Sequence, residues 1–463
     1  MAALRLDRIA AATGGTLFGG DGATIASGYA IDSRLVRTGD LFFAVVAGRD
    51  GHEYVTDAAA RGASGAVVSR AVEGLPSGFA LIRVADTVRA LQDLARSILA
   101  ENPVKVAAVT GSVGKTTTKE FMAAVLARRF DVLKSEGNFN NHLGLALSIL
   151  GLEPHHTAAV LEMGMRAAGE IRTLASIAPP DVAVITNVQP VHLESLGTLE
   201  AVAAAKWELV EGLKPGGAAI LNGDDSRLVR LAAGRKGGRT VFFGRGPHLE
   251  VGAENAIRLG FEGFGFSLRL GRRAVPCRLA FLTEGYLADA LAASAAAYAL
   301  DIPAEEIAAA VSSLRPAPGR GGWIRLAGGV VLVDDSYNSS PAALAAALRG
   351  LAGLPAARRV AVIGDMLELG PGEDAFHAEA GRIAAAAGWD VLLTIGPRSL
   401  RTAEAARTAG LDPAAIRSFA SSEEAAEALE RWLRPGDLVL VKGSRGMRTE
   451  IAAARIEHLF KEA

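Results

Sequence analysis

A repeated alternation of short apolar runs with helix-length segments constrains the fold of this chain more than any other feature. Between residues 104 and 317, apolar runs of strand length occur at 104–109, 157–163, 181–188, 218–222 and 240–244. Near-continuous apolar strands separated by helices predict a parallel sheet that is covered on both faces. In sheets of this kind, ligands bind at the carboxyl ends of the strands. The polar residues that follow each run are therefore the first candidates for a functional site.

The same alternation returns after residue 318 and indicates a second α/β block. Strand-length runs occur at 330–333, 359–363, 390–394 and 437–441, and helical spacing occurs at 341–351, 374–386, 400–409 and 423–433. A Rossmann-like sheet is the natural interpretation. The Gly-x-Gly-x-x-Gly fingerprint of NAD-binding proteins is absent, which counts against a dehydrogenase. Residues 315–320, Arg-Pro-Ala-Pro-Gly-Arg, form the expected linker between the two blocks.

Residues 1–101 have a different pattern, with short strands separated by glycines and helical spacing at 52–63 and 87–99. The segment Glu101-Asn102-Pro103 indicates a boundary, because a residue before proline favours extended backbone. We therefore predict an α/β protein of three domains: an N-terminal α/β domain at 1–101, a central domain with a mostly parallel sheet at 102–317, and a C-terminal Rossmann-like domain at 318–463. The length agrees with about three domains.

Composition narrows the class of protein. Hydrophobic residues make up 50% of the chain, which is enough to bury several cores. The net charge of −1 provides no field to attract nucleic acid or an anionic membrane, so an anionic ligand must be bound locally. The only cysteine, Cys277, excludes an internal disulfide and a cysteine-based zinc site. Charges within residues 1–12 argue against a signal peptide, and no apolar run has the length of a membrane span, so we expect a soluble cytoplasmic protein.

A glycine-rich loop follows the strand at 104–109 and precedes helical spacing at 115–129; it reads Thr110-Gly111-Ser112-Val113-Gly114-Lys115-Thr116-Thr117. A turn of this kind directs backbone N–H groups and the positive end of a helix at one spot, which suits a phosphate. Lys115 is placed to reach the terminal phosphates, and the Thr116 hydroxyl is placed to bind Mg²⁺. Val109 stands where the usual motif has its first glycine. A plain glycine turn is the alternative, and the strand-turn-helix setting favours phosphate binding.

Three further residues are candidates for chemistry. Glu162 ends the run at 157–163, where a carboxylate beside a phosphate loop suits Mg²⁺ or, alternatively, caps the next helix. His192 follows the run at 181–188, although a lone histidine is more often structural than a ligand. Lys206 lies within an alanine-rich helix, and its simplest interpretation is a solvated lysine.

Polar residues also end three strands of the C-terminal block: 334–341, 364–370 with His377, and 442–445. A helix cap by Ser339 or Ser340, with Pro341 at the first helical position, explains part of the first segment but not its two adjacent aspartates. Three polar strand ends on one sheet predict a cleft that faces the central domain.

The N-terminal loops carry Ser33, Arg34, Asp50 and His52, which could form a polar ligand site. Alternatively, Asp32 caps a turn and Arg34 belongs to a solvated surface pair. The sequence by itself slightly favours this second interpretation.

Taken together, these segments resemble the Mur ligase family, the ATP-dependent amino-acid ligases of peptidoglycan precursor synthesis. The resemblance covers nearly the whole chain, and its markers are 110–118 with Lys119 and Glu120, 138–141, Glu162, 187–194, Lys206, 334–338 and 442–445. Within the family, 335–338 and 364–370 with His377 most resemble the members that add D-alanyl-D-alanine. The resemblance implies that this dipeptide is joined to UDP-MurNAc-tripeptide through an acyl phosphate, with ATP and Mg²⁺. We expect a monomer with no nucleic-acid or membrane partner.

The resemblance also assigns roles to individual residues. For ATP it implies Thr110, Gly111, Ser112, Val113, Gly114, Lys115, Thr116 and Thr117, together with Arg320, Asp335 and Asn338. For magnesium it implies Thr116, Glu162, His192 and Lys206, the last as a carbamylated lysine. For the UDP substrate it implies Ser33, Arg34, Asp50, His52, Asn140 and Asn141. For catalysis it implies Lys115, Lys206, His192 and Asn140.

The chain departs from the family at two places. Val113 replaces the usual asparagine of the loop, and we expect a small effect because backbone N–H groups bind the phosphate. The family's His-Asn-…-Asn helix start near the adenine reads Gly-Tyr-Leu-Ala-Asp-Ala-Leu here, at 285–291, which leaves adenine recognition open.

Two rival functions are also open. A folylpolyglutamate synthetase would not be expected to carry a UDP-binding domain at 1–101, and a P-loop regulator would hydrolyse ATP without an amine acceptor.

Overall fold

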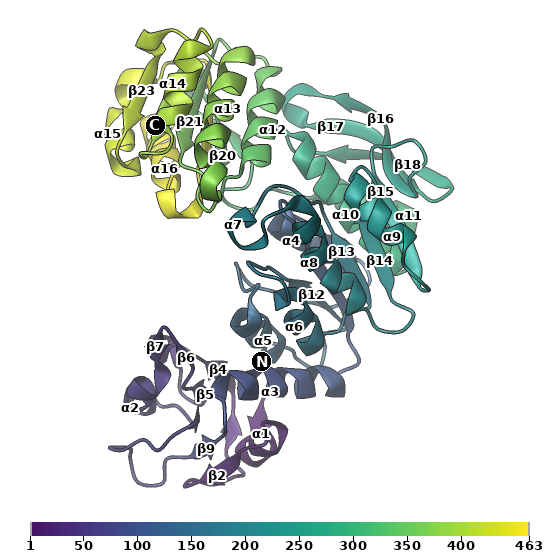
Figure 1. Ribbon diagram of the computed structural model, residues 1–463, viewed down its shortest axis with the longest axis vertical. Coiled ribbons are helices and arrows are strands. Elements are labelled where there is room, and N and C mark those ends of the chain that lie inside the picture. Colours follow the sequence, from purple (N-terminus) through teal and green to yellow (C-terminus); the bar gives the residue numbers. More distant parts are fainter. Residues whose placement is uncertain (1, 462–463) are drawn as a thin grey trace.

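The computed structural model describes residues 2–461, in which three large sheets follow one another along an open arc (Figure 1). The N-terminal and C-terminal parts lie at opposite ends of the arc, with the longest sheet between them. Residue 1 of the predicted N-terminal domain and residues 462–463 of the predicted C-terminal domain lie outside the described residues. Among the described helices, none combines the length and the apolar character that a membrane span needs.

A five-stranded sheet of order β2-β9-β8-β5-β4 forms the N-terminal part. Its strands are β2 (Thr16–Phe18), β4 (Gly28–Ala30), β5 (Asp40–Phe43), β8 (Gly65–Val68) and β9 (Leu81–Arg83). Two short antiparallel pairs join β1 (Leu4–Arg5) to β3 (Ile25–Ala26) and β6 (Val46–Ala47) to β7 (Arg49–Asp50). The helices are α1 (Leu6–Ala12), α2 (Val55–Ala60) and α3 (Thr87–Glu101). The helix predicted at 52–63 is thus shorter than expected, and a 3₁₀ turn, Gly51–Tyr54, precedes it.

A nine-stranded sheet of order β11-β12-β10-β13-β14-β15-β16-β17-β18 forms the centre. Its parallel strands are β10 (Lys105–Thr110), β11 (Val132–Lys134), β12 (Ala158–Glu162), β13 (Val182–Ile185), β14 (Ala218–Asn222) and β15 (Arg239–Gly244). β10 pairs with β12 on one side and with β13 on the other, so the strand order reverses at β10: β11 and β12 lie on one side and β13 to β15 on the other. A crevice at the carboxyl end of β10 follows from this topology.

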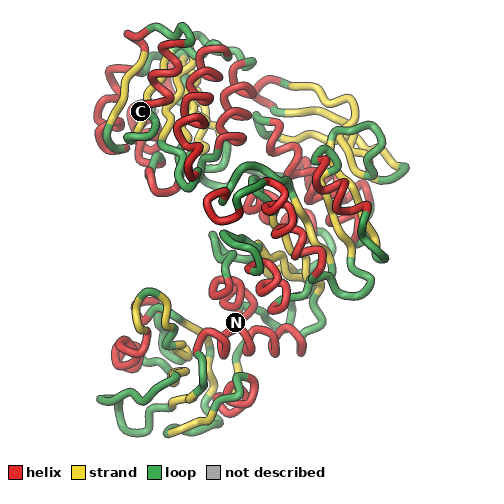
Figure 2. The backbone as a smooth tube through the Cα atoms, in the orientation of Figure 1, coloured by secondary structure: helices red, strands yellow, loops and turns green. Residues whose placement is uncertain are grey.

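Helices cover both faces of the central sheet, as its near-continuous apolar strands require. One face packs against α4 (Lys115–Leu126), α10 (Glu284–Ala299) and α11 (Ala304–Ser313). The other face packs against α5 (His142–Leu150), α6 (Glu170–Ile177), α8 (Leu199–Glu211) and α9 (Ser226–Ala233). The short helix α7 (Leu193–Leu196) lies after β13. The tube drawing shows this helix–sheet–helix layering (Figure 2).

The central sheet is mostly parallel, as the sequence predicted, but it continues beyond the predicted apolar runs. Its last three strands, β16 (Val251–Arg258), β17 (Phe264–Leu270) and β18 (Arg273–Leu279), form an antiparallel extension that the apolar runs did not indicate. In β17, buried and half-buried residues alternate along the strand because only one face is covered. Such a period-two pattern lacks the continuous apolar run that identified the other strands.

A six-stranded sheet of order β19-β20-β24-β21-β22-β23 forms the C-terminal part, and only the edge strand β19 is antiparallel. Its strands are β19 (Gly322–Arg325), β20 (Val331–Asp335), β21 (Arg358–Gly364), β22 (Val391–Ile395), β23 (Ile416–Phe419) and β24 (Asp437–Lys442). Its helices are α12 (Pro341–Ala352), α13 (Glu373–Ala386), α14 (Leu400–Thr408), α15 (Ser422–Trp432) and α16 (Glu450–Leu459). The Rossmann-like sheet predicted from the sequence is confirmed, with β19 and β23 added.

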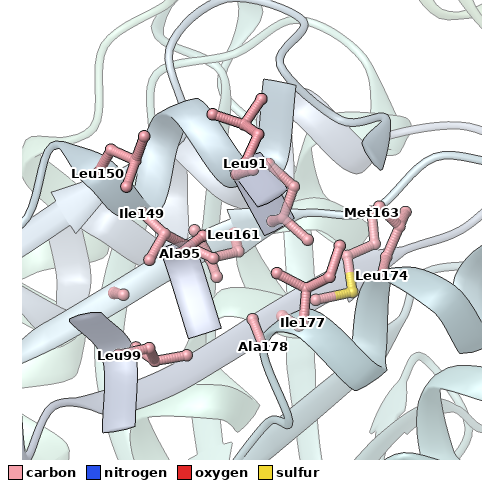
Figure 3. Close-up of a cluster of buried hydrophobic side chains, with 14 of the residues drawn as sticks. Leu91, Ala95, Leu99, Ile149, Leu150, Leu161, Met163, Leu174, Ile177 and Ala178 are labelled. Atoms are coloured by element: carbon pink, nitrogen blue, oxygen red, sulfur yellow. The ribbon is translucent and has the colours of Figure 1, made fainter. Parts of the chain in front are cut away.

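One hydrophobic core crosses the boundary predicted near residue 102. Leu91 and Ala95 of α3 lie against Ile149 of α5, Leu161 of β12 and Leu174 of α6 (Figure 3). All five side chains are at most 1% exposed. The N-terminal sheet is therefore packed on the central sheet through α3, and the division of the chain at 101 stays a prediction.

Candidate functional site

The glycine-rich loop lies between β10 and α4, as the sequence predicted. Gly111 has φ +153°, and a Cβ there would lie 1.8 Å from Thr186 Oγ1, so only glycine fits. Gly114 has φ +87° and precedes α4, and a Cβ there would lie 2.1 Å from Asp289 Oδ1. The turn and the helix start therefore present free backbone N–H groups at one place, which suits an anion.

Residues after β13 brace this loop. Asn187 Oδ1 accepts a hydrogen bond from the Val113 N–H at 3.0 Å, and Thr186 Oγ1 donates to the Val113 carbonyl at 2.6 Å. Gln189 N–H donates to Ser112 Oγ at 2.8 Å. The backbone of Val113, rather than its side chain, makes these bonds, which explains how valine is accommodated where the family has asparagine.

Lys115 is folded back over the loop that precedes it. Its ammonium donates to the carbonyls of Gly111 at 2.8 Å and Ser112 at 3.1 Å and has no ion pair with any described carboxylate. Burial lowers the pKa of Lys115, the Glu162 carboxylate opposes that effect, and Arg320 adds to it. A cation held only by neutral carbonyls leaves its charge available to an anionic ligand.

Two neighbouring strand ends carry polar oxygens that have no hydrogen-bond partner within residues 2–461. They are Thr110 Oγ1 on β10 and Glu162 Oε2 on β12. In the sheet, Glu162 pairs with Val109 of β10. Glu162 is 2% exposed, and its other oxygen accepts from Asn140 Nδ2 at 2.9 Å. The cap alternative for Glu162 is wrong, because α6 begins only at Glu170. An unpartnered buried carboxylate oxygen is costly, and a hard cation such as Mg²⁺ fits it.

Lys206 on α8 is 1% exposed, so its interpretation as a solvated lysine is wrong. Burial and, to a smaller extent, repulsion by the charge of Lys115 lower the pKa of Lys206 well below its usual value. No hydrogen bond or ion pair to its amine occurs in the described part of the chain. Burial therefore favours the neutral amine of Lys206, the form in which the nitrogen is nucleophilic.

His192 follows β13 with φ +54°, a backbone conformation that few non-glycine residues adopt. Burial, together with the charges of Lys115 and Lys206, lowers its pKa to about 4. The ring is thus neutral near pH 7, as a metal ligand must be. Across residues 2–461 no three His, Cys, Asp or Glu side chains form a metal-binding group. A cation at Glu162 would therefore need further ligands, such as phosphate oxygens or a modified Lys206.

A cavity of about 880 Å³ opens between the central and C-terminal sheets. Among the predicted site residues, those that line it are Ser112, Val113, Gly114, Lys115, Thr116, Thr117, Asn140, Asn141, Glu162, His192, Arg320, Asp335 and Asn338. Thr110, Gly111 and Lys206 lie outside its lining. Asn141 also has a structural role, because its Oδ1 caps α5 through the N–H groups of Leu143 and Gly144.

The C-terminal wall of the cavity is internally paired. Lys442 donates to Asp335 Oδ2 at 2.6 Å, and Tyr286 of α10 donates to Asp335 Oδ1 at 3.0 Å. The guanidinium of Arg320 lies 4.0 Å from the centre of the Tyr337 ring. These contacts connect the linker, α10 and β20 around one side of the cavity.

The predicted N-terminal residues form a separate group outside this cavity. The interpretation of Asp32 as a cap and of Arg34 as a surface partner is confirmed, with an Arg34–Asp32 distance of 2.7 Å. His52 is 3% exposed; its Nε2 accepts from the Ser69 N–H and its Nδ1 lies 2.6 Å from Asp50 Oδ1. His52 and Arg70 hold the pKa of Asp50 well below its usual range. Ser33 is buried in the 3₁₀ turn Ser33–Leu35.

Sequence reasoning missed several residues of the cavity wall, among them Gln189, Arg166 and Asp289. Gln189 and Arg166 follow the ends of β13 and β12, so their position after a strand was an available signal. Asp289 lies one turn inside α10, and no spacing along the chain indicated that its carboxyl group reaches the phosphate loop.

Comparison with known proteins places this site in a family. The model of the Mur ligase middle domain matches residues 109–297, and that of the Mur ligase, glutamate ligase domain matches residues 319–445. The UDP-N-acetylmuramoyl-tripeptide–D-alanyl-D-alanine ligase of Bacillus subtilis is 35% identical to the chain over 429 residues, which cover 92% of each protein.

Solved structures agree with this result. A crystal structure of MurF from Acinetobacter baumannii superposes with a TM-score of 0.90 at 30% identity and covers 99% of both chains. The MurF ligase of Thermotoga maritima in complex with ADP superposes with a TM-score of 0.82 at 30% identity, over 94% of this chain and 97% of that chain.

Proposed function

Because the chain belongs to the Mur ligase family, we propose that it joins D-alanyl-D-alanine to UDP-N-acetylmuramoyl-tripeptide at the expense of ATP. The products are UDP-MurNAc-pentapeptide, ADP and phosphate. One observation carries the proposal: a single cavity brings together the phosphate loop, the unpartnered carboxylate of Glu162 and the C-terminal residues Arg320, Asp335 and Asn338. Such a cavity can hold a nucleotide and an acceptor at the same time.

The chemistry has two steps. A carboxylate oxygen of the tripeptide attacks the γ-phosphorus of ATP, the bond to the β,γ-bridging oxygen breaks, and ADP leaves with an acyl phosphate formed. The amine of the dipeptide then attacks the acyl carbon, phosphate departs with the bonding electron pair, and the amine loses a proton. A carboxylate alone is a poor acceptor for an amine, and the phosphate supplies the leaving group.

Lys115 supplies positive charge to the first step. Its ammonium faces the space in front of the loop with only carbonyl partners, so it can move onto the transferring phosphoryl group without breaking an ion pair. Backbone N–H groups at the start of α4 bind the phosphates that stay on ADP. Positioning and charge stabilisation of this kind are the main means of catalysing phosphoryl transfer.

Magnesium fits the same place. Thr116, Glu162 and His192 would hold it, together with Lys206 if CO₂ converts its neutral amine into a carbamate. When bound, the ion neutralises charge on the phosphate oxygens. The carbamate forms from an unprotonated lysine, and the burial of Lys206 favours that form. Asn140 orients the Glu162 carboxylate through the 2.9 Å hydrogen bond between them.

The N-terminal loops bind the UDP end of the substrate through Ser33, Arg34, Asp50 and His52, and Asn140 and Asn141 lie at its peptide end. The N-terminal and C-terminal parts lie on the same, concave side of the arc (Figure 1). The linker 316–320 serves as a hinge on which the C-terminal part closes over ATP. Small-angle scattering should show compaction with an ATP analogue and substrate, and an unchanged radius of gyration would argue against the hinge.

We place the enzyme in the cytoplasm as a monomer with no nucleic-acid or membrane partner. ATP and a nucleotide-linked precursor are cytoplasmic compounds, and the net charge of −1 offers no field for nucleic acid or an anionic membrane. Light scattering on a sizing column gives the oligomeric state directly, and a dimer mass would correct this part of the proposal.

The decisive experiment measures phosphate release with ATP and Mg²⁺ while UDP-MurNAc-tripeptide and D-alanyl-D-alanine are added singly and together. Release that requires both, with UDP-MurNAc-pentapeptide detected by mass, supports the ligase. Release that needs neither would indicate an ATP-driven switch. Release with folate and glutamate would indicate the rival folylpolyglutamate synthetase.

A further inference from the structure

A carboxylic acid lies directly against the phosphate loop. Asp289 on α10 is 8% exposed and borders the cavity. Its Oδ1 accepts a hydrogen bond from Thr118 Oγ1 of α4 at 3.1 Å. The same oxygen lies 2.1 Å from the point that a Cβ on Gly114 would occupy, so it rests on the glycine that begins α4. Two positions of the loop and its helix are thus held by one side chain.

The charges around Asp289 do not stabilise an anion. It forms no ion pair with any described cation, and Lys115, one turn before Thr118, is directed to the loop carbonyls. Arg320 acts on it only as a nearby charge, and on its own helix the phenol of Tyr286 donates to Asp335. Burial raises the pKa of Asp289 to about 8, so the group is a neutral acid near pH 7.

At this location an ionised Asp289 would weaken the binding of an anionic ligand. A carboxylate at this point would stand beside backbone N–H groups that receive phosphate oxygens, and like charges at such a distance repel. A neutral acid instead accepts from Thr118 with one oxygen and keeps an O–H to donate. Oδ2 has no hydrogen-bond partner in the described part of the chain, and the residue borders the cavity, so that O–H can point toward a ligand acceptor.

We propose that Asp289 acts as the neutral acid and is a positioning residue of the phosphate loop, fixing Gly114 and Thr118 for the nucleotide phosphates. The proposal rests on the proposed function, since it takes this cavity to be the ATP site. On this proposal, Asp289 makes the affinity for the nucleotide depend on pH. Nucleotide binding favours the protonated form, so affinity is full below the pKa of Asp289 and falls as pH rises through it.

The test is the dissociation constant of ADP with Mg²⁺, measured by titration calorimetry between about pH 7 and about pH 9 at constant ionic strength. In the unmodified protein the constant should rise roughly fivefold or more over this range, because loss of one required proton weakens binding by up to tenfold per pH unit. Asp289→Asn keeps a neutral group that accepts and donates, and its constant should change less than about twofold over the same range. Asp181→Asn, at the opposite edge of the same sheet, is the matched control and should keep the pH dependence of the unmodified protein.

A second variant removes the contact itself. Asp289→Leu should raise the ADP dissociation constant roughly tenfold even near pH 7, because the loop loses its support. If that variant does not fold, Thr118→Val breaks the same hydrogen bond from the other side and should raise the constant by about threefold or more. Equal pH profiles for the unmodified protein and Asp289→Asn would overturn the proposal, as would unchanged affinity in Thr118→Val. Absence of ADP binding by the unmodified protein would instead count against the proposed function.

Discussion

The central and C-terminal sheets have the same kind of architecture but use the polar residues at their carboxyl edges in opposite ways. Both are mostly parallel and both have helices on their two faces (Figure 2). Both also carry charged residues where strands end, such as Glu162 and Asp335. At the central edge the charges lack protein partners. At the C-terminal edge the charged groups of Asp335, Asp365 and Lys442 have partners, whereas the buried hydroxyls of Ser339 and Ser340 have none within residues 2–461.

The central edge is chemically incomplete. Lys115 touches only carbonyls, Lys206 has no described partner, and Glu162 has one oxygen without a hydrogen bond. Burying groups in this state lowers stability, because desolvation is not compensated. A phosphate bound together with a metal ion would supply the missing partners of these positive and negative groups.

The main charged groups of the C-terminal edge are paired without a ligand. Lys442 pairs with Asp335 at 2.6 Å, Asp365 accepts from the Ser399 N–H at 2.7 Å, and His377 accepts from the Met366 N–H at 3.0 Å. These contacts hold loops against the sheet. The comparison teaches that buried charges without partners at a strand end indicate a ligand site more strongly than polar residues alone.

The largest effect is expected for Lys115→Ala. Loss of this charge should lower kcat/KM by roughly a thousandfold, or about 4 kcal/mol, because nothing else on the loop carries a positive charge to the transferring phosphoryl group. Phosphate release measures it, and thermal unfolding should show no loss of stability. Lys105→Ala, at the other end of β10, is the control. Near-normal turnover of Lys115→Ala would show that this unpaired charge at the central edge does not serve catalysis.

Lys206→Ala should lower turnover by about a hundredfold and respond to small carboxylic acids. Acetate or formate can supply the carboxylate that the carbamate would provide, so either should restore roughly a tenth of the activity. The measurement is steady-state phosphate release at increasing acetate concentration, with chloride as the control for ionic strength. Full activity of the variant without rescue would refute a carbamate role.

For the C-terminal edge the expected effect is on stability. Lys442→Met leaves Asp335 without its cation and should reduce the free energy of unfolding by about 3 kcal/mol. The double variant with Asp335→Asn should recover most of that loss, because no charge is then left buried. Denaturant unfolding of both variants measures this. A single variant as stable as the unmodified protein would show that the pair is not structural.

The smallest effect is expected at an exposed contact between the two parts. Arg166 and Glu368 lie 3.3 Å apart with side chains 79% and 62% exposed. Solvent screens such pairs, so Arg166→Ala should change the free energy of unfolding by less than about 0.5 kcal/mol. Denaturant unfolding at low and high salt tests this, and a larger, salt-sensitive loss would mean that the contact helps to hold the two sheets together.

Sequence reasoning found the elements but not the environment of each residue. Most strands of the two mainly parallel sheets, the loop 110–117 and the helix starts at 115 and 341 were predictable, because apolar runs, glycine and proline act locally. The strands β11, β19 and β23 were not predicted. The antiparallel extension β16–β18 was missed, since its strands alternate polar and apolar residues. Lys206 was misread as solvated because an alanine-rich helix does not reveal which face it buries.

The sequence by itself determined the α/β class, the phosphate loop and the family, because these follow from periodicity and from residues close together in the chain. The tertiary structure alone decided which charges are left without partners. Glu162, Lys206 and Asp289 lie on different elements, and their burial depends on crossovers that bring those elements to one edge of the sheet. Electrostatic environment depends on distance through space, and no local pattern along the chain records it.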